Sequence, residues 1–170
     1  TPTTTTAPAA AAEWLEGTFT VRRDDVYAID FQDMFGAANR DSIQYAIQAR
    51  PDEPPRLEVS EPVAEEVSAD GLIDIGAVGE DDFGLTRATF NWRMVQREDS
   101  QSTPLSLQFE GYSTRARMHD SKLVQDLSAR PGDTIEWWIS IWDNREDSQE
   151  RPAYQRTDSP VRTLHVLDTP

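Results

Sequence analysis

The chain has 170 residues and is strongly acidic, with 31 Asp and Glu against 16 Lys and Arg and a formal net charge of −15. A negative field of this size repels phosphate backbones and anionic membrane surfaces, so nucleic acid is excluded as an expected partner. Cysteine is absent, which excludes disulfides, zinc–thiolate centres and thiol nucleophiles.

The first twelve residues, TPTTTTAPAAAA, have the low-complexity composition of a disordered linker, so residues 1–12 are predicted to be one. No basic segment followed by an apolar run opens the chain, and no run approaches the roughly 20 apolar residues of a membrane-spanning helix. We therefore expect any export signal or membrane anchor to lie outside this sequence.

Residues 13–52 are predicted to be the N-terminal strands of a partial module. Apolar residues alternate with polar ones in short runs bounded by Gly, Asp and Asn, which is typical of β-strands; these runs are 17–21, 26–31 and 42–48. Residues 50–55 read RPDEPP. Because proline cannot continue a sheet ladder, this segment predicts a module boundary.

Residues 53–170 are predicted to form a complete module that begins with an extended edge strand within 56–67. Further strands are predicted at 72–78, 85–96, 105–110, 121–127, 134–142 and 160–167. Residues 121–127 are also the best helix candidate. In the fifth of these strands one face carries Ile135, Trp137, Ile139 and Ile141, and the other carries Trp138 and Trp142. Short alternating strands separated by turn residues predict an all-β, antiparallel sandwich.

Two stretches, residues 25–52 and 134–168, share one plan: an apolar strand ending in an acidic turn, a polar loop, and a second strand followed by Asp and Pro. This internal repeat predicts that the first stretch is the closing hairpin of an earlier module. Too few residues precede it to complete a seven-stranded sandwich. Three arrangements remain open: a chain cut from a longer protein, strands added to the second module, or strand exchange with another copy.

Residues 75–90, IGAVGEDDFGLTRATF, and residues 129–144, ARPGDTIEWWISIWDN, resemble the bacterial Ig-like modules, fibronectin- and cadherin-like, of large membrane-anchored proteins. The resemblance implies an Ig-like antiparallel β-sandwich in a cell-envelope, periplasmic or extracellular protein. It implies a non-catalytic structural or interaction role, with another protein or neighbouring modules of the same chain as partner. The chain lacks the several spaced calcium motifs of cadherins.

Four oxygen-bearing residues end predicted strands or begin loops: Asp81, Asp82, Asp143 and Asn144. If those loops share one end of the sandwich, the side chains form a candidate calcium site, because calcium takes about six to eight oxygen ligands. The alternative is that they are turn residues whose side chains bond their own backbone.

The tryptophans raise a second function, a carbohydrate-binding module in which Trp92, Trp138 and Trp142 stack on a glycan; core filling is the alternative for these rings. A catalytic role is not expected. The two histidines, His119 and His165, are far apart in sequence, and neither a G-x-S-x-G elbow nor an H-E-x-x-H motif is present.

Overall fold

Strands make up most of the chain in the computed structural model, which describes residues 17–97, 100–147 and 149–168. The prediction of an all-β chain is confirmed. The chain divides into two compact units, Thr1–Pro51 and Asp52–Pro170. The predicted linker, residues 1–12, lies outside the described residues.

The first unit is built around a two-stranded antiparallel sheet of β1 (Asp25–Ala28) and β2 (Gln44–Ile47). Tyr27 lies opposite Tyr45 in this hairpin. The two strands form a sheet of their own. The strand predicted at 17–21 is wrong, because no described strand includes these residues.

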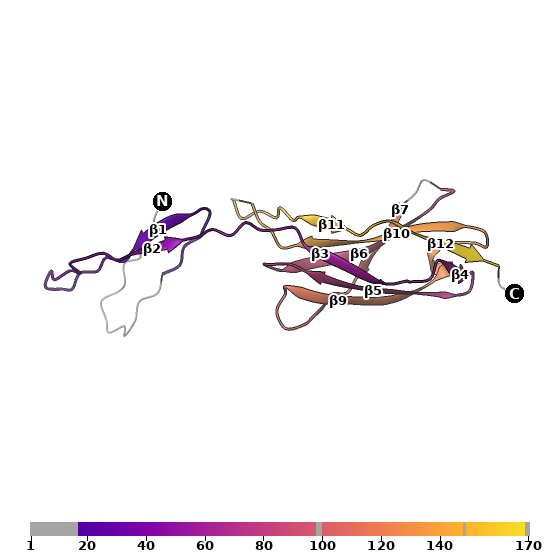
Figure 1. Cartoon of the computed structure of the whole chain (residues 1–170), viewed down its shortest axis with the longest axis horizontal. Helices are drawn as coiled ribbons and strands as arrows, with labels where there is room; N and C mark the ends of the chain where they lie inside the picture. Colours follow the sequence, from indigo (N-terminus) through magenta and orange to yellow (C-terminus); the bar gives the residue numbers. More distant parts are fainter. Residues whose placement is uncertain (1–16, 98–99, 148, 169–170) are drawn as a thin grey trace. The chain divides into compact units, whose positions relative to one another are not determined.

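The second unit contains two sheets that lie against each other as the layers of a sandwich (Figure 1). The larger sheet has the order β4 (Glu66–Ser68), β12 (Arg162–Leu167), β10 (Thr134–Asp143), β6 (Leu85–Met94) and β7 (Ser100–Leu105), with β11 (Arg156–Asp158) also paired to β10. The smaller sheet has the order β3 (Arg56–Glu61), β5 (Leu72–Glu80), β9 (Arg115–Leu123) and β8 (Gln108–Phe109). All these pairs are antiparallel except β4 with β12.

The core lies between the layers and follows the alternation of the two central strands of the larger sheet. The predicted inner face of β10 is buried, at no more than 1% exposure for each residue: Ile135, Trp137, Ile139 and Ile141. Alternate residues of β6 are buried with them, including Phe90 and Trp92, whose rings lie 5.6 Å apart. Removal of this apolar surface from water is the main favourable contribution to folding of the unit.

Two predicted boundaries are corrected by the structure. The strand predicted at 121–127 ends at Leu123, and a 3₁₀ turn, η1 (Val124–Leu127), follows it. Val124 and Leu127 are both buried, and a separation of three residues places them on one side of a 3₁₀ turn. The single edge strand predicted within 56–67 is two strands, β3 and β4, in different sheets. In the described part of the chain, no helix has the length and hydropathy of a membrane span.

The outer strands of the sheets are short or interrupted. β7 forms one edge of the larger sheet and contains Pro104, which lies opposite Thr89 of β6. β4 at the other edge has three residues, and β8 at one edge of the smaller sheet has two.

A close approach of the two layers at Gly79 gives a first stability prediction. A Cβ at this position would overlap Cδ1 of Ile141 and would lie 3.2 Å from Cδ1 of Leu85, and all of these groups are buried. We expect Gly79→Ala to destabilise the sandwich by about 1–3 kcal/mol, because the core has no space for another carbon. Urea unfolding measures the change; an unchanged midpoint would show that the layers separate more easily than their packing indicates.

Candidate metal centre

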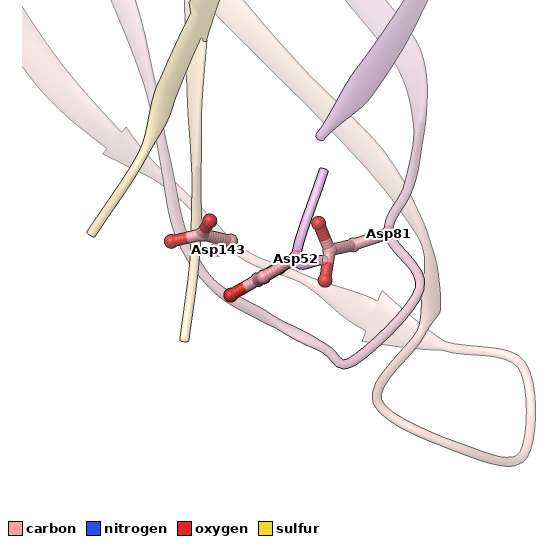
Figure 2. A group of neighbouring side chains, drawn as sticks. All are labelled: Asp52, Asp81 and Asp143. Atoms are coloured by element: carbon pink, nitrogen blue, oxygen red, sulfur yellow. The ribbon is translucent and has the colours of Figure 1, made fainter. Parts of the chain in front are cut away.

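Strand register brings three separate segments to one end of the sandwich. In the smaller sheet Arg56 at the start of β3 pairs with Glu80 at the end of β5, so the residues preceding β3 lie beside the loop that follows β5. In the larger sheet Leu85 at the start of β6 pairs with Asp143 at the end of β10. The β5–β6 loop joins these two places, and Figure 2 shows Asp52, Asp81 and Asp143 gathered there.

The three carboxylates are spaced to share one cation. One oxygen from each of Asp52, Asp81 and Asp143 lies within 4.8 Å of the corresponding oxygens of the other two. Oxygens that bind one calcium ion at about 2.3–2.6 Å are separated from each other by no more than about 5 Å. The cluster therefore has the dimensions of a single calcium coordination sphere.

Asp81 is oriented by the turn that it begins. Its Oδ2 accepts hydrogen bonds from the N–H groups of Phe83, at 2.9 Å, and Gly84, at 2.6 Å. Gly84 has a φ of +148°, and a Cβ there would lie 2.8 Å from Oγ of Ser113, so the turn requires glycine. The other carboxylate oxygen, Oδ1, is buried and has no hydrogen-bond partner.

Asp143 is fully buried, and, as in Asp81, one carboxylate oxygen accepts hydrogen bonds while the other has no partner. Its Oδ1 accepts hydrogen bonds from the N–H groups of Arg145, at 3.1 Å, and Gln155, at 2.7 Å. Its Oδ2 is buried without a partner, and the residue is 0% exposed. Burial of a charged oxygen without a partner costs several kcal/mol, and a bound cation would remove that cost.

Asp52 and Asp82 complete the acidic cluster. The backbone carbonyl of Asp52 accepts a hydrogen bond from Nε2 of Gln155, at 3.1 Å, while its Oδ1 is buried and unpartnered. Both carboxylate oxygens of Asp82 are also buried and unpartnered. Burial raises the pKa of Asp52, and the negative charges of Asp143, Asp81 and Asp82 raise it further, against a lowering by Arg145.

The structure therefore brings together Asp81 and Asp143 of the four predicted residues, with Asp82 close enough for its charge to act on Asp52. Asn144 is exposed, and its Nδ2 donates to the carbonyl of Phe83 at 3.3 Å, which ties it to the same loop. The sequence prediction missed Asp52, because the residue lies in the proline-rich segment that was interpreted only as a boundary. The turn alternative is also partly realised, since one oxygen of Asp81 and one of Asp143 bond to backbone.

The three tryptophans predicted to bind a glycan do not all lie on one face. Trp92 is 7% exposed and lies in the core, so its ring cannot stack on a sugar. Trp138 and Trp142 are half-buried on the opposite face of the larger sheet. The guanidinium groups of Arg87 and Arg156 lie 4.1 and 5.2 Å from the ring centre of Trp142. Trp142 therefore already has two cationic partners.

A shallow groove lies beside β12 in the described surface. Its lining includes Glu65, Arg162 and His165. Arg162 donates to two backbone carbonyls, those of Pro62 at 3.3 Å and Val59 at 3.4 Å. Nδ1 of His165 lies 3.2 Å from the hydroxyl of Thr134. The Arg162 bonds tie β3 and the β3–β4 connection to the larger sheet, and the His165 contact joins β12 to β10. Both residues therefore have a structural role.

The raised pKa of Asp52 predicts how the calcium-free sandwich responds to pH. A carboxyl group whose folded pKa lies above its ordinary value of 3.8 contributes stability that is complete below that pH and is lost as the pH rises through the folded pKa. We expect the free energy of unfolding of the calcium-free Asp52→Asn variant not to show this decrease with rising pH. Urea unfolding of the parent and the variant in EDTA, from acidic to neutral pH, measures the difference. Parallel dependence of the two free energies on pH would contradict the prediction.

No known protein-family model matches the chain, and a search of curated proteins finds no similar sequence.

Proposed function

We propose that the chain is a non-catalytic structural module of a bacterial envelope or extracellular protein, and that its sandwich binds one calcium ion between the loops at one end. The ion would bind the unpartnered oxygens of Asp52, Asp81 and Asp143, with Asp82 adjacent. The observation that carries the proposal is Oδ2 of Asp143, a fully buried carboxylate oxygen without a partner that lies among other carboxylates.

Calcium fits this cluster better than the other common divalent cations. The candidate ligands are all carboxylate oxygens, which suit hard cations, whereas zinc and copper favour imidazole and thiolate. Magnesium needs near-ideal octahedral geometry at about 2.0–2.1 Å and gives up its water reluctantly. Calcium accepts an irregular oxygen shell, which water and backbone carbonyls would complete.

The role of the ion follows from the origin of its ligands. Asp81, Asp82 and Asp143 lie where strands of the two layers end, whereas Asp52 lies in the segment that enters β3. A bound ion would therefore connect both layers and the entering segment of the unit. It would replace the mutual repulsion of four carboxylates by attraction to a shared positive charge, which is a structural contribution.

Calorimetric titration of the EDTA-treated chain with calcium, and separately with magnesium, tests the proposal. We expect one calcium ion per chain, a Kd at or below about 10⁻⁴ M and weaker binding of magnesium. Calcium at about one hundred times the Kd should stabilise the sandwich by about 2.7 kcal/mol. The absence of both binding heat and a rise in melting temperature would overturn the calcium site.

The exposed Asp126 provides a matched control, because it lies at the other end of the sandwich from the acidic cluster. Asp126 is in η1, which follows Leu123 at the end of β9, and Leu123 pairs with Leu72 at the start of β5, whereas Glu80 beside the cluster is at the end of β5. Asp126→Asn removes the same charge as a substitution in the cluster but should leave calcium binding unchanged. Loss of binding in this variant would indicate a general effect of net charge.

A further inference from the structure

The hairpin of the first unit has one apolar face that is largely open to solvent. Tyr27 and Tyr45 lie directly opposite each other, with ring centres 5.0 Å apart. These two residues, here called the hairpin face, are 38% and 42% exposed. An isolated two-stranded hairpin is marginally stable in water, so this face needs a covering layer.

The turn between β1 and β2 and the turn between β10 and β11 share a set of backbone hydrogen bonds and of hydrogen bonds to an Asp side chain. Asp33 begins one turn and Asp147 the other. In each, the Asp N–H donates to the carbonyl four residues on at 2.8 Å, and the Asp carbonyl accepts from the N–H three residues on, at 3.1 and 3.0 Å. In each, Oδ1 of the Asp accepts from the N–H groups two and four residues on, at 2.8–3.0 Å.

The surroundings of the two turns also match. Gly36 and Glu150, each three residues after the Asp, have positive φ values of 86° and 58°. A single β-bridge flanks each turn, formed by the residue before the Asp and the residue five positions after it. The repeat expected from sequence thus has a structural counterpart, in which β2 and β11 are each the strand that follows the turn. The registers differ by two residues, because Tyr27 pairs with Tyr45, twelve residues after Asp33, whereas Ile141 pairs with Thr157, ten residues after Asp147.

This correspondence identifies what covers the hairpin face in a complete module. The residue six positions before each Asp is Tyr27 in the first unit and Ile141 in the second. Ile141 is 0% exposed and lies against Gly79 of the opposite layer, whereas Tyr27 is 38% exposed. The residues twelve positions before each Asp are Val21, 46% exposed, and Ile135, fully buried.

We infer that β1–β2 is the closing hairpin of a second β-sandwich, and that the hairpin face packs against the opposite sheet of that sandwich. The sheet would be supplied by strands equivalent to β3, β5 and β9, encoded N-terminal to the hairpin in the natural protein. A second copy of this chain is a poorer occupant, because each copy carries a net charge of −15 and two copies repel. The inference does not depend on calcium.

Hydrogen exchange in EDTA tests the inference by comparing the 170-residue chain with the natural polypeptide extended N-terminally by the residues that its gene encodes. We expect the β1 and β2 amides to exchange rapidly in the shorter chain and at least about 100-fold more slowly in the extended protein. Unchanged exchange, or a gene that encodes no further strands upstream, would overturn the inference. The inference would also be overturned if sedimentation showed the shorter chain to be a dimer and its β1 and β2 amides exchanged slowly. In that case a second copy of the chain would cover the hairpin face.

Two substitutions in neighbouring residues make the test specific to the hairpin face. In the extended protein, Tyr27→Ser should restore rapid exchange, because it places a small polar group against the opposite layer. Val26 lies on the other face of β1 and is 57% exposed, so Val26→Ser should leave exchange within about twofold of the parent, as is usual for surface positions. Equal effects of the two variants would contradict packing on one face.

Discussion

Replacing Asp143 by asparagine is expected to abolish the stabilisation of the chain by calcium and to leave the calcium-free sandwich at least as stable as the parent. Asparagine keeps the oxygen that accepts from the N–H groups of Arg145 and Gln155, so the local backbone is retained. It replaces the unpartnered, buried Oδ2 by a neutral group, which removes the charge that needs a cation. The expected loss at saturating calcium is about 2.7 kcal/mol, for a concentration of about one hundred times the parent Kd.

The opposite signs in the two conditions distinguish a metal ligand from a residue that only supports the fold. Thermal unfolding of the parent and Asp143→Asn, each in EDTA and in calcium, provides the comparison, with Asp126→Asn as the control. A purely structural Asp143 would make the variant less stable by the same amount in both conditions. That result would contradict its role as a calcium ligand.

Trp137→Ala is expected to destabilise the sandwich by about 3–5 kcal/mol, the range for truncation of a buried large aromatic residue. Trp137 is 1% exposed at the centre of the inner face of β10, and its ring centre lies 5.9 Å from that of Phe90. Its Nε1 has no hydrogen-bond partner, so the loss comes from packing and from the contact with the Arg162 guanidinium, which lies 5.5 Å from the ring centre. Trp137→Phe should therefore cost much less than the alanine substitution.

The adjacent Trp138 is the control for this prediction, because it lies on the other face of the same strand and is only half-buried. Trp138→Ala should cost less than half as much as Trp137→Ala in urea unfolding. Equal losses would show that the outer face of β10 is covered to the same degree as the inner one, contrary to the burial pattern.

Strands could be predicted from the sequence where apolar and polar residues alternate strongly. Short or polar strands could not. The inner residues of β10 alternate without interruption, which fixes both the strand and its buried face. By contrast, β11 has three residues, Arg156–Asp158, and its sequence RTD has no apolar period. It forms because β10 and the turn at Asp147 place it beside Ser140. A local sequence pattern cannot predict a strand whose formation depends on such a tertiary contact.

The candidate site was predictable only in part for a similar reason. Asp81 and Asp143 could be identified because each lies at the end of a strongly patterned strand. Asp52 could not, because its place depends on the pairing of Arg56 with Glu80, a register between two strands in different predicted segments. The prediction that Trp92 stacks on a glycan is wrong, because Trp92 shares the alternation of Phe90 on β6 and is buried with it.

The outer strands of the second unit affect how such modules behave when many are held close together. An open strand edge exposes unpaired N–H and carbonyl groups that can recruit a strand from a neighbouring molecule and seed aggregation. Pro104 removes one N–H donor from β7, and β4 and β8 offer only three and two residues for such pairing. β4, β7 and β8 are therefore poor templates for strand pairing when several such sandwiches are held close together.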